Sequence, residues 1–317
     1  MTSWKNVVLI PCKDEELAVA QVVSAVKKIS PQSPVVVIDN GSTDRTAFVA
    51  EKAGAEVLRY AAPGKGRALC HALERISADS YTFVDGDGTY DLSRLPEMIQ
   101  AVRDGAAMAT GVRRTEARKA FPRFHRFGNF LFTQLISLLF RKKVQDVLSG
   151  LRVLSHDFVS YSPLTVHGFE VEAYYTLESL VRDLPYEEFE IGYGVRPPGS
   201  ASKLRSFRDG FKILWCIFDL FRMYRPLAFF GFFSTACFAL SLLSGWQPIS
   251  EFLQEGYVYA VPRAVLAAAL MNLSFVLSGL GLILSSQMRF HLRNLEIHRF
   301  QKQRRLEVQK EGMRRVS

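Results

Sequence analysis

Residues 80–91 read SYTFVDGDGTYD, a stretch in which two acidic residues directly follow an apolar strand. Its first part is typical of a buried strand, and Asp85 and Asp87 come next with a single glycine between them. Two carboxylates so close repel each other unless a cation neutralises them. Since carboxylate oxygens favour Mg²⁺ or Mn²⁺, the pair is a candidate metal site. Asp and Gly are also turn residues, so a solvated turn is the alternative.

Other kinds of metal site do not fit the sequence. A calcium-binding EF-hand loop starting at Asp85 would need Gly at its sixth position and Glu at its twelfth, where this chain has Tyr90 and Pro96. The six histidines form no ligand cluster, which argues against zinc. The four cysteines show no paired spacing and fall mainly in segments expected on the cytoplasmic side, so we expect reduced thiols.

Strand-like and helix-like segments alternate over the first 200 residues. Apolar runs at 6–11, 35–39, 56–60 and 81–84 are separated by segments with helical spacing. This alternation predicts an α/β fold with buried parallel strands. In such sheets ligands bind beyond the carboxyl ends of the strands. The polar stretches after the first, second and fourth runs are therefore candidate ligand-binding segments.

Two later segments are long enough to cross a membrane. Residues 227–246 and 264–287 contain no charged residue, and each is close to the roughly 20 residues that a spanning helix needs. Buried core helices are the alternative. Arg222 and Arg225 precede the first segment, and residues 287–317 carry nine Lys or Arg against three Glu. The positive-inside rule therefore predicts a multi-pass protein of the inner membrane, with its first domain and both termini in the cytoplasm.

The excess of basic residues also indicates contact with a membrane. The net charge is +9, and most of the excess lies in the tail, which suits an anionic leaflet and argues against a nucleic-acid partner. Residues 203–225 place large apolar side chains on one helical face and charged ones largely opposite. This pattern predicts a helix lying on the membrane surface, with a helix packed on the first domain as the alternative.

Four motifs follow the expected strands in order: LIPCKDEE, VVVIDNGSTDRT, PGKGRAL and FVDGDGTY. Together they resemble family-2 glycosyltransferases with a GT-A fold, over roughly residues 6–205. DVLSGLR and RPPGSASKL, followed by two apolar segments, resemble the branch of dolichyl- and polyprenyl-phosphate sugar synthases. The expected fold class is thus α/β, a GT-A domain with a Rossmann-like, mostly parallel sheet, interfacial amphipathic helices and two C-terminal transmembrane helices. The expected division is a GT-A domain (1–202), an interfacial helix (203–225), a transmembrane hairpin (226–288) and a basic cytoplasmic tail (289–317).

The resemblance implies roles at the donor side of the site. Pro11, Glu16 and Asp39 are expected around the nucleobase and ribose of a nucleotide sugar, although Asp39 also fits a helix cap or turn. Lys65, with Arg67 nearby, is expected at the donor phosphates, and solvated charge is the alternative. Asp85 is expected to hold the donor nucleoside and the metal, and Asp87 to bind the metal directly. Thr89 stands where relatives often have Gln, which leaves a third side-chain ligand in doubt.

The resemblance also implies an acceptor side. Candidate ligands of an acceptor phosphate are Arg113, Arg123 and Arg126, the last two of which could instead form a basic patch at lipid headgroups. Arg196, Ser200 and Lys203 match the family's R..G.SK signature, which is expected near the donor pyrophosphate and the acceptor. Asp146 and Glu172 belong to the same region, and one of them is expected to contact the hydroxyls of the donor sugar. The expected catalytic residues are Asp87, Arg113, Asp146 and Arg196.

A lipid phosphate acceptor does not require a general base on the enzyme. Its second pKa is about 6, so at neutral pH it is largely a dianion and needs no general base. A divalent cation would neutralise the charge that grows on the departing diphosphate. We therefore predict a metal-dependent, inverting transfer of a single sugar from a nucleotide donor to a polyprenyl phosphate. The resemblance favours a UDP-sugar over a GDP-sugar.

Several alternatives stay open at this point. A GT-A enzyme acting on a hydroxyl of a glycolipid or cell-envelope glycan would need a base, Asp146 or Glu172. A non-catalytic membrane sensor of sugar nucleotides is the alternative from another class. The absence of a Gln-x-x-Arg-Trp stretch argues against a processive synthase, and the absence of an opening Gly-rich loop argues against a nucleotidyltransferase. Small-x-x-x-small pairs at Gly231–Thr235 and Ser274–Ser278 would permit close helix packing, within one chain or in a homo-oligomer.

Overall fold

The structure is a computed structural model with two compact units, residues 1–217 and 218–317. It describes the backbone of residues 4–114, 123–140, 142–162, 168, 170–198 and 206–316. Within these ranges it describes all side chains except those of residues 123–130, 206–210, 212–213 and 295–316.

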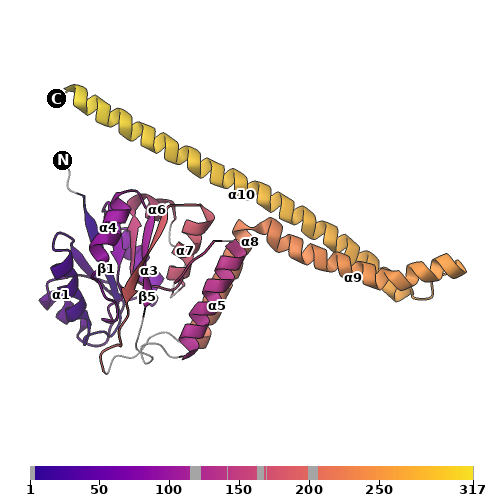
Figure 1. Ribbon diagram of the computed structural model, residues 1–317, viewed down its shortest axis with the longest axis horizontal. Coiled ribbons are helices and arrows are strands. Elements are labelled where there is room, and N and C mark those ends of the chain that lie inside the picture. Colours follow the sequence, from indigo (N-terminus) through magenta and orange to yellow (C-terminus); the bar gives the residue numbers. More distant parts are fainter. Residues whose placement is uncertain are drawn as a thin grey trace. The chain divides into compact units, whose positions relative to one another are not determined.

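The first unit is built on a mixed sheet whose described strands follow the order β3-β2-β1-β4-β6-β5-β7 (Figure 1). The strands are β1 (Asn6–Cys12), β2 (Val35–Asp39), β3 (Glu56–Arg59), β4 (Ser80–Phe83), β5 (Met108–Arg114), β6 (Arg152–Ser155) and β7 (Tyr186–Gly192). β1 pairs in parallel with β2 and β4, as β2 does with β3 and β5 with β7. Only β6 is antiparallel to its neighbours among these strands. The predicted α/β class with a mostly parallel sheet is confirmed.

Helices cover both faces of this sheet. They are α1 (Val19–Ile29), α2 (Thr46–Lys52), α3 (Lys65–Leu73), α4 (Leu95–Arg103), α5 (Arg123–Phe140), α6 (His156–Tyr161) and α7 (Val171–Val181). Val8 and Ile10 of β1 belong to a hydrophobic cluster with residues of α1, α2 and α4. Val7 and Leu9, which alternate with them, are equally buried, and α3 contacts β1. Since successive strand residues point to opposite faces, β1 is buried on both sides, as expected for a parallel sheet.

The strand directions gather several loops at one edge of the sheet. Cys12 pairs with Asp39, and both stand at the carboxyl ends of parallel strands. β4 also runs parallel to β1, so the loop that begins after Phe83 opens on the same edge. β6 runs the other way, and Arg152 at its start pairs with Phe83. The segment that precedes β6 therefore reaches this edge too, next to the loop after β4.

Arg152, on β6, is a buried cation that sequence analysis did not single out. Its side chain is 1% exposed. Its guanidinium donates hydrogen bonds to the carbonyl oxygens of Val147 and Ser149 at 2.7 and 2.8 Å and to Thr176 Oγ1 at 2.8 Å. These contacts join the segment before β6 to α7. Burial lowers the pKa of Arg152 from its usual value, because desolvation penalises the charged form.

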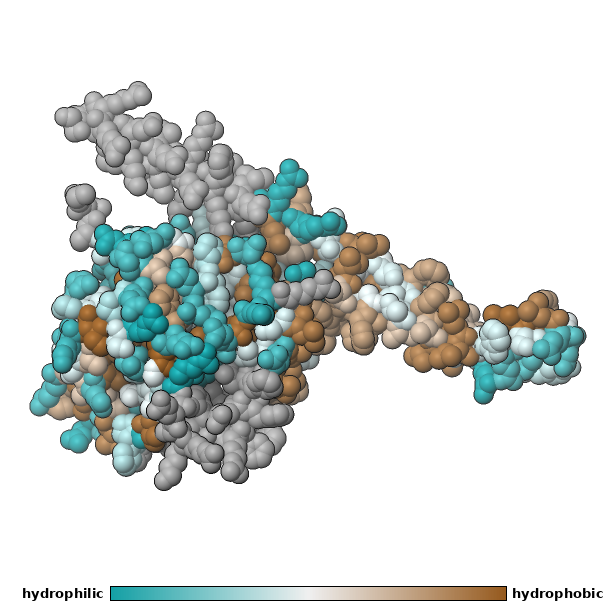
Figure 2. Space-filling view, in the orientation of Figure 1, coloured by the Kyte–Doolittle hydropathy of each residue, from teal (hydrophilic) through white to brown (hydrophobic). Residues whose placement is uncertain are grey.

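The second unit contains two apolar helices, α9 (Pro226–Glu255) and α10 (Val261–Val316). Pro226–Glu255 and Val261–Asn294 are long and apolar enough to cross a membrane. Figure 2 shows apolar side chains over this part of the chain, and large ones such as Phe232 and Trp246 are exposed. The two predicted apolar segments thus lie within two helices that are candidate membrane spans.

Serine side chains join α9 to α10. Ser234 Oγ donates to the carbonyl oxygen of Ser274 at 2.9 Å and lies 2.8 Å from Ser278 Oγ. The predicted pair Ser274–Ser278 therefore packs within the hairpin. The other pair does not, since Thr235 bonds to the carbonyl of Gly231 in its own helix and a Cβ added at Gly231 would meet no atom within 4 Å.

α8 (Ser206–Tyr224) has two different faces. Phe211 and Trp215 are exposed, whereas Ile217 and Leu220 are buried. The apolar side chains are thus divided between a packed face and an open one. A helix on the membrane surface and a helix packed on the first domain both stay predictions.

Replacing Arg152 with Met should destabilise the first unit. The change leaves two buried carbonyls and a buried hydroxyl without their donor, which we expect to cost about 3 kcal/mol. For a domain of this size such a loss lowers the midpoint of thermal unfolding by roughly 6–12 °C. The measurement is thermal unfolding of the purified full chain in detergent.

The matched control is Arg94→Met, which removes an exposed ion pair with Glu97 and should change the midpoint little. Equal midpoints for Arg152→Met and the unmodified chain would show that the guanidinium contacts do not hold the fold.

Candidate active site

Asp85 and Asp87 lie in the loop after β4 and are fixed there by close packing. A Cβ added at Gly86 would lie 2.3 Å from Cys12 Sγ, and one added at Gly150 would lie 2.2 Å from Asp85 Oδ2. A Cβ at either position would force the Cys12 or the Asp85 side chain to move, so the loop lies directly against β1 and the Asp85 carboxylate against the segment before β6. Asp87 is 3% exposed. The acid pair is therefore part of a packed site and not a solvated turn.

Lys65, the first residue of α3, pairs with two carboxylates. Its Nζ lies 2.5 Å from Asp85 Oδ1 and also forms an ion pair with Glu172 of α7. Burial opposes the charged form, but the two carboxylates raise the pKa of Lys65 above its usual value. Burial likewise opposes ionisation of Asp85, but Lys65, Arg113 and Arg196 together outweigh it, so the pKa of Asp85 is lowered. Lys65 is thus a firmly protonated counterion of Asp85.

Both oxygens of Asp87 have partners. Oδ1 accepts hydrogen bonds from the backbone NH and the hydroxyl of Thr89 at 3.0 and 2.6 Å. Oδ2 lies 2.6 Å from Arg196 Nη2, while Nη1 of the same guanidinium lies 3.3 Å from Glu15. Burial and the neighbouring Asp85 raise the pKa of Asp87. Thr89, which stands where relatives often have Gln, fixes the orientation of Asp87 here.

Arg113, near the end of β5, is held by Asp146. Its Nε and Nη2 donate to the two carboxylate oxygens at 2.7 and 2.8 Å, and its backbone NH donates at 3.2 Å. The guanidinium also lies over the ring of Tyr193, 5.4 Å from its centroid. Tyr193 meets Tyr90 edge to face at 5.2 Å. This bidentate pair fixes the plane of the guanidinium, so in this arrangement Asp146 positions Arg113.

The loops after β1 and β2 are bound to each other. Asp14 accepts a hydrogen bond from the backbone NH of Thr43 at 2.7 Å, and the backbone NH of Glu15 donates to Thr46 Oγ1 at 2.8 Å. Glu16 accepts from the backbone NH of Arg45 at 3.0 Å. The polar residues before α2 therefore hold the loop after β1 in place. Arg45, the N-cap residue of α2, makes no side-chain capping hydrogen bond.

Pro11 and Asp39, predicted at the donor nucleoside, stand half-buried on neighbouring strands at the same edge. Asp39 Oδ1 accepts a hydrogen bond from the backbone NH of Ser42 at 3.0 Å, so it also closes a turn. Asn40, which sequence analysis missed, bonds to the carbonyls of Tyr60 and Ala62 and accepts from the NH of Gly64. Its amide shapes the loop that leads into Lys65.

The predicted residues that the structure brings into mutual contact form two ion-pair groups, one around the acid pair and one around Arg113. They comprise Lys65, Asp85, Asp87, Arg113, Asp146, Glu172 and Arg196. The side chains of Arg123 and Arg126 on α5, and all of Ser200 and Lys203, lie outside the described residues. Arg67 is exposed, as its solvated alternative requires. Glu15 was missed, although its motif PCKDEE was noted.

The charges of these groups do not cancel. Among the described side chains five carboxylates, including Glu15, contact three cations, so with the nearby Arg152 the carboxylates outnumber the cations by one. Among the described residues no three His, Cys, Asp or Glu side chains are arranged to hold a metal ion on their own. The acids that could hold one are Asp85 and Asp87, with oxygens from a bound ligand completing the coordination.

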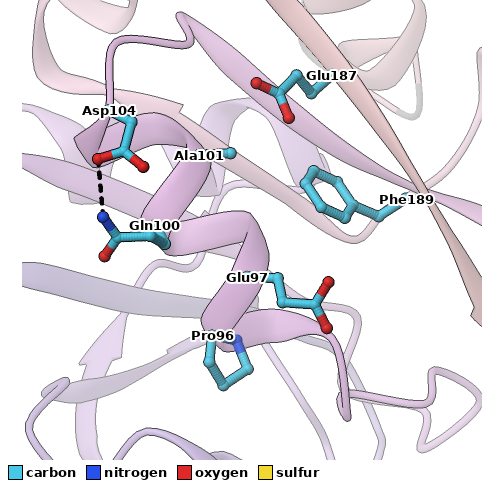
Figure 3. A pocket seen from close by; sticks show the side chains of 7 residues that line it. All are labelled: Pro96, Glu97, Gln100, Ala101, Asp104, Glu187 and Phe189. Carbon is cyan, nitrogen blue, oxygen red and sulfur yellow. Dashed lines mark hydrogen bonds between the residues drawn. The ribbon is translucent and has the colours of Figure 1, made fainter.

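A separate shallow groove lies between α4 and β7 (Figure 3). It is lined by Pro96, Glu97, Gln100, Ala101, Asp104, Glu187 and Phe189, and Gln100 donates a hydrogen bond to Asp104 at 2.8 Å. None of the predicted site residues lines this groove. The chemistry is therefore assigned to the ion-pair groups and not to the groove.

The sequence is similar to those of known glycosyltransferases. The sequence model of glycosyl transferase family 2 matches residues 7–161. Glycosyltransferase AglJ of Haloferax volcanii is 30% identical over 296 residues, which cover 91% of this chain and 97% of that protein. The dolichyl-phosphate hexose transferase of the same organism is 31% identical over 146 residues, 46% of this chain and 64% of that protein.

The fold has solved counterparts. Glucosyl-3-phosphoglycerate synthase from Mycobacterium tuberculosis, in complex with Mn²⁺, UDP and glucosyl-3-phosphoglycerate, aligns with a TM-score of 0.58 at 20% identity. The alignment covers 69% of this chain and 80% of that one. This likeness confirms the predicted GT-A fold. The similarity to AglJ extends over nearly the whole length of both proteins, so the chain belongs to glycosyltransferase family 2 and is a glycosyltransferase.

Proposed function

We propose that this enzyme transfers one sugar from a UDP-sugar to a polyprenyl phosphate at the cytoplasmic face of the inner membrane, with inversion at the sugar carbon. The observation that carries the proposal is the acid pair at the carboxyl edge of the sheet, where Asp85 and Asp87 form ion pairs with Lys65 and Arg196. The non-catalytic sensor is set aside because the relatives are glycosyltransferases.

Asp85 and Asp87 are proposed to hold a divalent ion together with the donor diphosphate. Two features fit such an ion: two adjacent carboxylates, and a surplus of carboxylates over cations among the described side chains. Glucosyl-3-phosphoglycerate synthase, with the same fold, binds Mn²⁺ and UDP. When bound, Mg²⁺ or Mn²⁺ would neutralise the charge that grows on the departing diphosphate.

The cations of the site are proposed to hold phosphate oxygens. Lys65 and Arg196 stand beside the acid pair and are assigned to the donor diphosphate. Arg113, whose plane Asp146 fixes, is assigned to the acceptor phosphate, because a guanidinium held in this way suits bidentate phosphate contact. Arg123, Arg126, Ser200 and Lys203 stay predictions for the acceptor. Pro11, Glu16 and Asp39 are assigned to the nucleoside.

The proposed acceptor is a lipid phosphate and not a hydroxyl. A hydroxyl acceptor needs a carboxylate base, but both oxygens of Asp146 accept from Arg113, and Glu172 is assigned to the donor sugar. A phosphate dianion needs no base, only cations that position it. One relative is named for a dolichyl phosphate, which is a polyprenyl phosphate lipid. Glu172 is assigned to the hydroxyls of the donor sugar.

The apolar helices are proposed to anchor the enzyme where its acceptor resides. α9 and the first part of α10 would span the membrane, and the basic residues on both flanks would face the cytoplasm. α8, with its exposed Phe211 and Trp215, would lie at the lipid surface. The division of the chain into 1–202, 203–225, 226–288 and 289–317 is part of this proposal.

Asp87→Asn should abolish metal-dependent transfer. The amide keeps the shape of the side chain but removes the charge that holds the ion, and we expect transfer to fall by about 10²–10³-fold. The assay incubates the full chain with undecaprenyl phosphate, Mn²⁺ and a panel of labelled sugar nucleotides, and measures label in the organic phase.

Asp91→Asn is the matched control, since Asp91 is an exposed aspartate four positions away whose carboxylate accepts hydrogen bonds only from Ser93 among the described groups. The control should retain activity. Full activity of Asp87→Asn, or activity unaffected by EDTA, would contradict the metal role.

A chain that ends at Arg225 should separate donor chemistry from acceptor use. Without α9 and α10 it should still bind UDP and slowly hydrolyse the donor, because the donor residues all belong to the first unit. Transfer to undecaprenyl phosphate in liposomes should drop well below that of the full chain, while a short-chain, water-soluble polyprenyl phosphate should be affected less. Unchanged use of the long-chain lipid by the truncated enzyme would refute the proposed anchoring role.

A further inference from the structure

Each member of the acid pair has a counterion supplied by the chain itself. Lys65 Nζ forms an ion pair with Asp85 Oδ1 at 2.5 Å, and the Lys65 side chain is 12% exposed. Arg196 Nη2 forms an ion pair with Asp87 Oδ2 at 2.6 Å, and the Arg196 side chain is 28% exposed. Both cations also reach a second carboxylate, Glu172 for Lys65 and Glu15 for Arg196. One oxygen of each carboxylate is thus already paired with a positive charge.

A divalent ion alone is a poor competitor for these oxygens. It would approach Asp85 and Asp87 against the charges of Lys65 and Arg196 a few ångströms away, and like charges repel most strongly where water is excluded. If it displaced them, two cations would stay in a largely buried site with their partners weakened. Both effects oppose the binding of free metal.

A metal ion that arrives bound to a nucleotide diphosphate brings its own negative charge. The diphosphate of a UDP-sugar carries two negative charges, which cancel those of one divalent ion, so the complex adds no net charge to the site. Its phosphate oxygens can accept from Lys65 and Arg196 while the ion takes over Asp85 and Asp87. Lys65, Arg196, Asp85 and Asp87 then each exchange one charged partner for another.

We propose that Lys65 and Arg196 are exchangeable counterions of the acid pair, which they release to the metal when they pass to the donor diphosphate, so that the site selects the metal–nucleotide complex over free metal. This inference rests on the proposed function, because it assumes that Asp85 and Asp87 receive the metal.

The exchange has a consequence for the donor sugar. Lys65 bridges Asp85 and Glu172, so a move of its ammonium group toward a phosphate releases both carboxylates together. Glu172 then becomes available to the hydroxyls of the sugar at the moment the metal–diphosphate arrives. Binding of the diphosphate and recognition of the sugar are coupled through a single side chain, although Lys65 and Glu172 are 107 residues apart in sequence.

The test measures Mn²⁺ binding by the full chain in detergent, from the electron paramagnetic resonance signal of free Mn²⁺, with and without UDP. The unmodified chain should bind Mn²⁺ at least roughly tenfold more tightly when UDP is present. Equal affinity with and without UDP would overturn the proposal, and this comparison needs no variant.

Lys65→Met and Arg196→Met remove one counterion each. Each should raise the affinity for Mn²⁺ alone by roughly tenfold and lower the gain that UDP brings. Lys65→Arg, which keeps the charge, should restore weak binding of Mn²⁺ alone. The matched control is Arg94→Met, because the described ion pair of this arginine is with Glu97 and not with a carboxylate of the site, and it should change neither affinity. Unchanged or weaker binding of Mn²⁺ alone in both charge-removing variants would refute the exchange.

Asp87→Asn separates this inference from the proposed function. If that variant binds Mn²⁺ with UDP as tightly as the unmodified chain does, the acid pair is not the metal site and the proposed function fails. If it loses Mn²⁺ binding while Lys65→Met and Arg196→Met leave the affinity for Mn²⁺ alone unchanged, the metal site stands and only the exchange fails.

Discussion

The rest of the site depends on electrostatic neutralisation of two carboxylates that a parallel sheet holds at the tip of one buried strand. Asp85 and Asp87 are separated by a glycine that cannot carry a Cβ, and the loop that holds them presses on Cys12 and Gly150. Their positions are set by packing, so their mutual repulsion cannot be relieved by moving apart. Cations must relieve it instead, and Lys65 and Arg196 are the cations that the chain supplies.

The surrounding fold serves to place these charges. The loop after β4 carries the acids, β5 carries Arg113, and the start of α3 carries Lys65. The reversed direction of β6 brings Asp146 and Gly150 back to the same edge. Arg152 joins that returning segment to α7, the helix of Glu172. Buried charges contribute little or negatively to stability unless they are fully paired. A family-2 glycosyltransferase thus accepts a costly set of buried ions at the place where it handles a charged donor.

Much of the site could be predicted from residues that are local in sequence. Asp85, Asp87 and Lys65 stand out because polar residues follow apolar runs, and the alternation of those runs gives the parallel part of the sheet. The pairing could not be predicted in the same way. Lys65 meets Glu172 and Asp87 meets Arg196 across more than a hundred residues, and such contacts depend on strand order. The antiparallel β6 leaves no periodic signal of its own direction. In sequence, Arg152 looks like any arginine after an apolar residue. Only the structure shows that it is buried and joins the segment before β6 to α7.

The central claim is that Asp85 and Asp87 receive a divalent ion together with a donor diphosphate. The most direct measurement is the anomalous scattering of manganese in crystals of the full chain grown with MnCl₂ and UDP. The account predicts one strong anomalous peak within about 2–2.5 Å of carboxylate oxygens of both residues, bridged to the diphosphate. UDP bound at this edge of the sheet with no manganese beside either carboxylate, in crystals of an enzyme that transfers sugar, would contradict it.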